Sequence, residues 1–311
     1  MNITTKQFSF VSKYDAVPIH GTCLIPENPI GIFQMVHGMS EHKGRYMFFM
    51  RWMAEHGMIT LMHDNRGHGQ SVKDDADIGY CYDSMDKGFV EDIYRVTKNI
   101  RKEYPELPLI LYGHSMGSLA VRAYLREHDD AIDALIVSGC PAYNTGVPAG
   151  KLIVKATMAS LGDRYRSKFM QNLVLGGFER QFADENREDA WLVAKQSPDI
   201  EAEFGDNPIC DFIYTLNGIM SLLNLESQTY TAPKYQVRNE QLPIYFVSGA
   251  DDPCYINSER WGHAIDRLKN MGYQQVSSKL FAGMRHEIHN EEDYESVYND
   301  ILHFCKSVIN A

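Results

Sequence analysis

The 311-residue sequence has no pair of cysteines at the C-x-x-C spacing that zinc sites and redox sites use. Scattered cysteines without this spacing are typical of a reducing compartment, so we expect a cytoplasmic protein without a zinc cluster. The six cysteines are Cys23, Cys81, Cys140, Cys210, Cys254 and Cys305.

Long hydrophobic runs are also missing. The most apolar stretch, residues 212–225, contains Asn217, Gly218 and Asn224 and is too short to span a bilayer. Residues 1–10 have no apolar core flanked by basic residues, so no signal peptide is predicted.

Positive charge is scarce, because 30 Lys and Arg residues face 41 Asp and Glu residues, for a net charge of -11. This balance argues against nucleic acid or an anionic membrane surface as the main partner. A P-loop is absent too. The glycine turn Arg66-Gly67-His68-Gly69-Gln70-Ser71 lacks its spacing and lysine, and we interpret it as structural support beneath a site.

What the sequence does have is alternation of strand-like and helix-like segments, without repeats. Strands are predicted at 7–12, 19–25, 31–36, 58–62, 109–112, 134–138, 243–248 and 276–281, the first two forming a hairpin. Helices are predicted at 45–56, 85–104, 258–271 and 291–308, and another follows residue 115. This order predicts an α/β fold with a mostly parallel sheet covered on both faces.

The alternation stops between residues 141 and 235, which read as helices and loops. We therefore predict a core of residues 1–140 and 236–311 with an inserted helical lid at 141–235, although an ordinary second domain is an alternative. One helix face of this segment collects Phe212, Leu216, Ile219, Met220 and Leu223. It forms the lid's own core or an apolar underside suited to a greasy substrate.

The segment Gly113-His114-Ser115-Met116-Gly117 joins a predicted buried strand to a predicted helix. A G-x-S-x-G motif in this context predicts a nucleophile elbow, a strained turn that presents the serine hydroxyl beside a helix N-terminus. Gly113 and Gly117 would let the backbone pass without clashes. Ser115 is the predicted nucleophile.

A serine nucleophile needs a histidine base and an acid that orients it, and in this architecture they follow in the order Ser, acid, His. Asp252, after one late strand, is the preferred acid, with the adjacent Asp251 as the alternative. His286, after the next strand, is the predicted base. His289 is expected to begin the last helix as a surface or capping residue.

The tetrahedral intermediate needs two backbone N–H donors in an oxyanion hole. Met116, directly after the nucleophile, should supply one of them. The other should come from the loop after the third strand, where the turn at His37-Gly38 makes Met39 the expected donor.

Several blocks together resemble the monoacylglycerol lipase and lysophospholipase-like group of α/β-hydrolases. They are His37-Gly38-Met39-Ser40-Glu41-His42, Arg45-Tyr46, Asp64-Asn65-Arg66-Gly67-His68-Gly69-Gln70-Ser71, Gly113-His114-Ser115-Met116-Gly117, and the segments around Asp252 and His286. The resemblance implies a carboxylester hydrolase with Ser115, Asp252 and His286 as its triad. Met39, Ser40 and Ser118 depart from residues common in that group, without removing a catalytic group.

The leading hypothesis is hydrolysis of a single-chain lipid ester of the monoacylglycerol or lysophospholipid type, without metal or cofactor. Nucleic acid is not an expected partner. A transient contact of the lid with a membrane or micelle is expected, and the sequence leaves the oligomeric state open. Alternatives are a short-chain carboxylesterase, a non-catalytic binding protein on the same fold, and an aminopeptidase or amidase. The last would need acidic residues to hold an amine, such as Glu179, Glu185, Glu188 and Glu201.

Overall fold

The chain opens with the antiparallel hairpin that the sequence predicts, β1 (Ile3–Val11) and β2 (Pro18–Pro26). The computed structural model describes residues 2–175, 178–185, 187, 190–204, 210 and 212–310. Strand β1 begins at Ile3, four residues before the predicted start. Its added residues, among them Thr4, Thr5 and Lys6, are mostly exposed on an edge strand and so lack the alternation that marks a half-buried strand.

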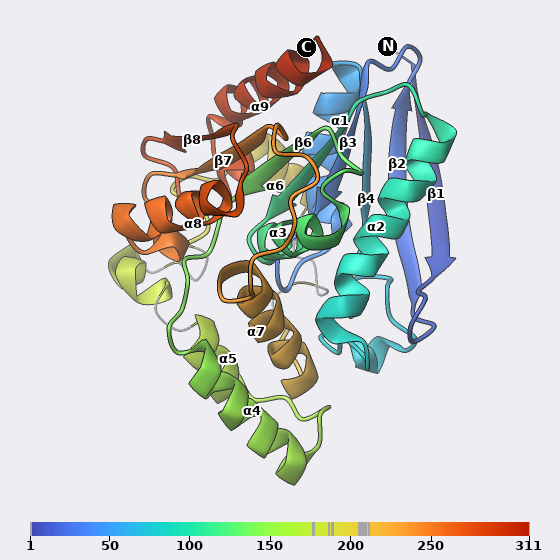
Figure 1. Cartoon of the computed structure of the whole chain (residues 1–311). Coiled ribbons are helices and arrows are strands. Elements are labelled where there is room, and N and C mark those ends of the chain that lie inside the picture. The colour runs from blue at the N-terminus through green and yellow to red at the C-terminus, as the bar shows by residue number, and fades with distance from the viewer. Residues whose placement is uncertain are drawn as a thin grey trace.

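Six further strands complete one eight-stranded sheet in the order β1-β2-β4-β3-β5-β6-β7-β8 (Figure 1). From β4 to β8 all neighbours are parallel, and β2 pairs antiparallel with β4. Strands β3 to β6 are buried along their whole length, which explains their continuous apolar runs. The six are β3 (Gly31–Val36), β4 (Met58–His63), β5 (Leu109–His114), β6 (Ala134–Ser138), β7 (Ile244–Gly249) and β8 (Val276–Phe281).

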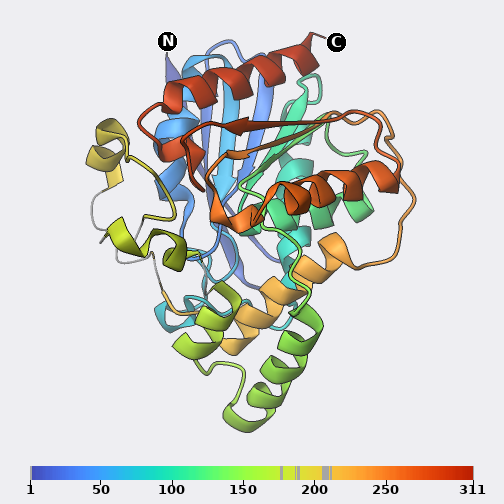
Figure 2. The ribbon, with the colours of Figure 1, turned by 90° about the vertical axis from the view of Figure 1, so that its left-hand side faces the viewer.

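Helices cover both faces of this sheet (Figures 1 and 2). One apolar core lies between the sheet and α2 (Met85–Glu103), α3 (Met116–His128) and α8 (Ser258–Met271). A second lies between the opposite face and α1 (Met47–Glu55) and α9 (Tyr294–Ile309). Short 3₁₀ turns occupy Lys43–Tyr46 (η1), Asp75–Asp77 (η2), Pro253–Tyr255 (η4) and Ile288–Asn290 (η5). The prediction of a mostly parallel, two-sided α/β sheet is confirmed.

Between β6 and β7 the described residues form helices and no strand. We call residues 147–230 the helical insertion; its interpretation as a lid stays a prediction. It comprises α4 (Val147–Leu161), α5 (Lys168–Leu175), the 3₁₀ segment η3 (Glu179–Glu185), α6 (Pro198–Phe204) and α7 (Leu216–Tyr230). Throughout the described part of the chain, no helix combines the length and the apolar character needed to cross a membrane.

The helical insertion has a small apolar core of its own. Leu216, Ile219 and Leu223 of α7 are buried against Val154 of α4, and Met39, from the loop after β3, packs against the same cluster. The predicted apolar face of α7 therefore faces the core of the insertion and extends toward the predicted oxyanion loop. On the outside, large apolar side chains of α4 and α5 stay exposed, namely Leu152, Ile153, Leu161, Phe169 and Leu173.

Arg66 anchors the glycine turn that the sequence assigns to structural support. Its guanidinium is fully buried and lies 2.7 Å from Asp15 Oδ2 and 2.7 Å from Asp92 Oδ2. It also donates to Ser12 Oγ at 2.7 Å. This one cation therefore connects the hairpin, the turn after β4 and helix α2.

Replacing Arg66 with Met should lower the free energy of unfolding by about 3–5 kcal/mol, because two buried carboxylates lose their cation. Urea denaturation of both proteins measures this loss. Lys6→Met is the matched control, since Lys6 pairs with Glu103 at the surface, and such a pair contributes less than about 1 kcal/mol. Equal losses in the two variants would contradict the assigned role of Arg66.

Candidate active site

Ser115 lies at the corner between β5 and α3, with φ 52° and ψ -117°. A non-glycine residue at positive φ is strained and needs its surroundings to hold it there. The flanking glycines explain how the corner closes. A Cβ atom at Gly113 would lie 2.5 Å from the carbonyl oxygen of Gly117, and a Cβ atom at Gly117 would lie 2.3 Å from that of Val36. The predicted turn is thus present, with a half-buried serine at its tip.

The predicted site residues all follow the carboxyl ends of parallel strands. Met39 follows β3, Ser115 follows β5, Asp252 follows β7 and His286 follows β8. Because these strands are parallel, their carboxyl ends meet at one edge of the sheet, where open α/β sheets bind their ligands.

Asp252 and His286 form a buried pair. His286 Nδ1 lies 3.1 Å from each carboxylate oxygen of Asp252, and both residues are at most 3% exposed. Asp252 also accepts hydrogen bonds from Ser248 Oγ at 2.6 Å and from the Cys254 amide at 2.8 Å. The alternative acid, Asp251, is exposed. Of the two candidates, the structure therefore brings Asp252 to His286.

The pair shifts the proton affinities of both members. Burial lowers the pKa of His286, but the carboxylate of Asp252, together with the charges of Glu287 and Glu41, offsets this effect and raises the pKa above its ordinary value. Burial raises the pKa of Asp252, and His286 with the other donors lowers it below the ordinary value. The arrangement favours an Asp252 carboxylate that fixes the Nδ1–H tautomer of His286.

Residues between Ser115 and His286 show that the two lie in the same region of the site. A Cβ atom at Gly38 would lie 3.2 Å from Ser115 Cβ, and one at Gly139 would lie 3.0 Å from His286 Cε1. The ring of His114, which precedes Ser115, is 4.7 Å from the ring of His286 between centroids. Among the hydrogen bonds of the described residues none joins Ser115 to His286, so that contact stays a prediction.

The loop after β3 is held rigidly beside this corner. His37 is fully buried, and its Nε2 accepts a hydrogen bond from the Asn65 amide at 2.9 Å. The Gly38 amide donates to Glu41 Oε1. Met116 is the first residue of α3, where an amide has no partner within the helix. These positions suit the two predicted oxyanion donors, Met39 and Met116, whose roles remain predictions.

The amino-acid sequence matches a known protein family over most of its length. The sequence profile described as serine aminopeptidase, S33 matches residues 27–293. The chain belongs to the serine aminopeptidase S33 family. Among curated relatives, it is 26% identical over 280 residues to a monoacylglycerol lipase of Mycolicibacterium smegmatis, covering 90% of this chain and 89% of the relative. It is 24% identical over 289 residues to monoglyceride lipase of Mus musculus, covering 91% and 83% of the two chains.

Solved structures resemble this S33 family member over nearly its whole length. A thermostable carboxyl esterase from Bacillus coagulans in complex with glycerol aligns with a TM-score of 0.86 at 24% identity, covering 98% of this chain and 99% of the esterase. A soluble variant of monoglyceride lipase from Saccharomyces cerevisiae aligns at 0.70 with 17% identity, covering 95% and 94%. The α/β-hydrolase fold and the predicted resemblance to the monoacylglycerol lipase group are confirmed.

An ionic network that no sequence motif indicated joins the oxyanion loop after β3 to residues 282–293 after β8, which we call the histidine loop. Arg45 contacts both oxygens of Glu287 at 2.7 and 2.8 Å and Glu41 Oε2 at 2.9 Å. Tyr46 donates to Glu41 Oε1 at 2.9 Å. Burial raises the pKa of Glu41 to about 7 despite Arg45. Burial also acts to raise the pKa of Glu287, but the two-pronged contact with Arg45 lowers it to about 2.

The expectation for His289 is wrong. It lies in the 3₁₀ turn η5, three residues beyond His286, and is 1% exposed. Its ring stacks on Tyr46 with centroids 4.7 Å apart and meets the edge of His114 at 4.9 Å. Burial lowers the pKa of His289 to about 3. The last helix begins only at Tyr294 because Glu291 is extended, so His289 packs inward rather than capping that helix.

Residues 190–197 of the helical insertion, which we call the strap, bind the histidine loop. The Glu287 amide donates to the Leu192 carbonyl at 2.7 Å. The Glu291 carboxylate accepts from the Ala194 and Lys195 amides at 2.8 and 3.0 Å. The indole of Trp191 stacks on His286 with centroids 5.2 Å apart. The insertion therefore holds the predicted base in place through contacts that no sequence motif predicted.

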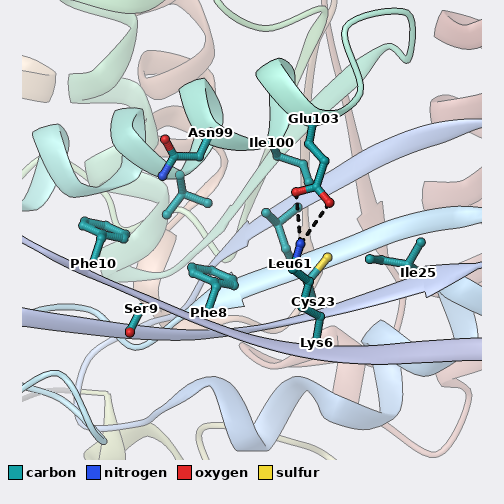
Figure 3. Close-up of a pocket in the computed structure, with 11 residues that line it drawn as sticks. Lys6, Phe8, Ser9, Phe10, Cys23, Ile25, Leu61, Asn99, Ile100 and Glu103 are labelled. Carbon is teal, nitrogen blue, oxygen red and sulfur yellow. Dashed lines mark hydrogen bonds and ion pairs between the residues drawn. The ribbon is translucent and has the colours of Figure 1, made fainter.

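A pocket lies between the β1–β2 hairpin and α2, and none of the predicted site residues lines it (Figure 3). Phe8, Cys23 and Ile100 line it, together with the Lys6–Glu103 ion pair. Its volume of 100 Å³ is below the roughly 300–1,000 Å³ of ordinary ligand pockets. We therefore do not assign a substrate to it.

We expect Asp252→Asn to lower the pKa of His286, because the carboxylate that opposes the effect of burial is gone. A proton NMR titration, with the His286 resonance identified from a His286→Gln variant, measures the change. Since the base must be neutral, loss of activity on acidification should then set in at lower pH than in the parent. The rate should also fall about 10⁴-fold, the loss seen for a triad aspartate in a serine protease. Asp251→Asn is the matched control and should change neither quantity.

Proposed function

We propose that this chain cleaves single-chain lipid esters, of the monoacylglycerol or lysophospholipid type, with Ser115, His286 and Asp252 as its triad. The chain is a carboxylester hydrolase, the class of the relatives named monoacylglycerol lipase. The observation that carries the proposed mechanism is the buried Asp252–His286 pair at the same sheet edge as the strained Ser115.

In the first half-reaction, Ser115 Oγ attacks the ester carbonyl carbon while His286 Nε2 takes its proton. Asp252 holds the Nδ1–H and stabilises the imidazolium. The Met39 and Met116 amides bind the oxyanion. The tetrahedral intermediate collapses when His286 returns the proton to the leaving alcohol, which departs and leaves an acyl ester on Ser115. Water then repeats the sequence, and the free acid and Ser115 hydroxyl are regenerated.

The apolar character of the helical insertion favours a substrate with a lipid acyl chain. Its apolar core reaches Met39, so a chain bound at the oxyanion loop meets apolar side chains rather than water. The relatives named monoglyceride lipase support the same substrate class. In this proposal residues 141–235 act as a lid over the site.

An aminopeptidase is the second candidate, because the family carries that description. The acidic residues considered for amine binding do not support it. Glu185 is exposed and pairs with Arg285, and Glu201 is exposed as well. Glu188 and the side chain of Glu179 lie outside the described residues. Hydrolysis of an ester is therefore preferred over hydrolysis of a peptide bond.

Ser115→Ala should lower kcat by about 10⁶, as loss of the nucleophile does in a serine protease. The assay uses p-nitrophenyl esters from short to long acyl chains beside an amino-acid p-nitroanilide. We expect ester cleavage to rise with chain length and the anilide to stay intact. Ser296→Ala, an exposed serine on α9, is the control and should retain full activity and labelling by a fluorophosphonate.

Substantial activity in Ser115→Ala would reject the assignment of the nucleophile. Cleavage of the anilide in preference to every ester would favour the aminopeptidase, and a preference for the shortest esters would favour a short-chain carboxylesterase. Absence of both hydrolysis and fluorophosphonate labelling in the parent protein would favour a non-catalytic binding protein.

We propose further that the outer face of α4 and α5 meets lipid interfaces. Leu152 is 71% exposed and Phe169 74% exposed, and this position suits delivery of a lipid to the insertion. The double variant Leu152→Ser, Phe169→Ser should cleave a micellar long-chain ester several-fold more slowly. Each apolar side chain that no longer enters the micelle weakens binding of the protein to the micelle by about 1.5–3 kcal/mol at most. Rates on a dissolved short-chain ester should be unchanged. Val11→Ser, on the exposed edge strand, is the control, and an equal effect there would contradict the proposal.

A further inference from the structure

The thiol of Cys254 has no part in the proposed hydrolysis, yet it lies against the predicted base. Its Sγ is 3.8 Å from His286 Nε2, the nitrogen that would take the proton of Ser115. Cys254 is 3% exposed and His286 2% exposed. One sulfur, one imidazole nitrogen and the Asp252 carboxylate thus lie within 4.8 Å of one another.

The spacing matches a metal chelate. Zinc binds sulfur at about 2.3 Å and imidazole nitrogen at about 2.0–2.1 Å, so tetrahedral coordination separates the two donors by about 3.6 Å. The observed 3.8 Å requires only a small adjustment of two side chains.

Asp252 supplies what metal-binding histidines usually have. It accepts the hydrogen bond of His286 Nδ1, which leaves the lone pair of Nε2 free to bind a metal. Carboxylate–histidine–zinc arrangements use this contact to fix the tautomer and increase the basicity of the ligand nitrogen. The contact that prepares His286 as a base therefore also prepares it as a ligand.

We infer that Cys254 Sγ and His286 Nε2 form a binding site for a thiophilic divalent ion such as Zn²⁺ or Cd²⁺, and that the bound ion inhibits the hydrolase. The inhibitory part rests on the proposed function, because it assumes that Nε2 is the base. On binding, the thiol releases its proton to solvent and sulfur donates an electron pair to the ion, as Nε2 does. The blocked nitrogen then has no lone pair for the proton of Ser115. Hard ions such as Mg²⁺ do not favour a thiolate ligand.

The first test measures binding without catalysis. Equilibrium dialysis against Zn²⁺, and the ultraviolet charge-transfer band of a cadmium thiolate, should show one more bound ion in the parent protein than in Cys254→Ser. His286→Gln should lose the same ion. Cys305→Ser is the matched control, since Cys305 is an equally buried thiol in α9 outside this metal-ligand cluster, and it should bind as the parent does.

The second test measures inhibition, with each variant compared to its own metal-free rate. Cys254→Ser should raise the zinc concentration for half-inhibition by at least about tenfold, the lower range of losses seen even for partners outside the first ligand shell. Mg²⁺ at the same concentration should not inhibit.

Equal zinc binding in the parent and Cys254→Ser would overturn the metal site, whatever the enzyme hydrolyses. Specific binding at Cys254 without inhibition would overturn the inhibitory part. Failure of the proposed function appears separately, as activity that survives Ser115→Ala, and leaves the dialysis result intact as the test of the site.

Discussion

The close approach of two backbones at the corner between β5 and α3 is the constraint on which the site depends. Gly117 lies so near the Val36 carbonyl that no Cβ atom fits between them. The helix can therefore start directly against the end of β3, and the chain must turn through a left-handed conformation at Ser115 to reach it. The same closeness brings Gly38 beside Ser115. The predicted nucleophile and the predicted oxyanion loop are thus placed by one packing contact rather than by two independent ones.

Charge fixes the second relation, between the oxyanion loop and the histidine loop. One half-buried cation, Arg45, faces two buried carboxylates. Glu287 receives both arms of the guanidinium and remains ionised, whereas Glu41 receives one contact and has a pKa raised to about 7. Glu41 also accepts the Gly38 amide and the Tyr46 hydroxyl. The arrangement ties residues 242 positions apart in the sequence into one unit beneath the sheet edge.

The sequence predicted what depends on local pattern. Fully buried parallel strands are apolar throughout, so β3 to β6 were predicted to within a few residues. The elbow was evident because Gly113 and Gly117 have a steric reason to be glycine. The extension of β1 to Ile3 had no signal in the sequence, because exposed residues of an edge strand do not alternate between apolar and polar side chains.

What could not be predicted depends on contacts between distant segments. His289 looks like a helix cap until one sees that Tyr46, from another loop, stacks on its ring. Trp191 and the strap lie in an insertion with no motif, and their contacts with the histidine loop arise only once β7 and β8 have brought that loop to the sheet edge. The choice between Asp251 and Asp252 was open for a related reason, since adjacent carboxylates differ in direction and not in chemistry.

The geometry of that choice explains why a thiol lies beside the predicted base. Asp252 caps the 3₁₀ turn Pro253–Tyr255, and its side chain accepts the Cys254 amide. This cap turns the carboxylate toward His286, and it also fixes the backbone of Cys254 two residues on. The orientation of the acid and the proximity of the sulfur therefore share one cause. A side chain at position 254 must lie near the imidazole whatever its chemistry, so an exchange of sulfur for oxygen there changes the affinity for a metal while the cap that orients the acid remains.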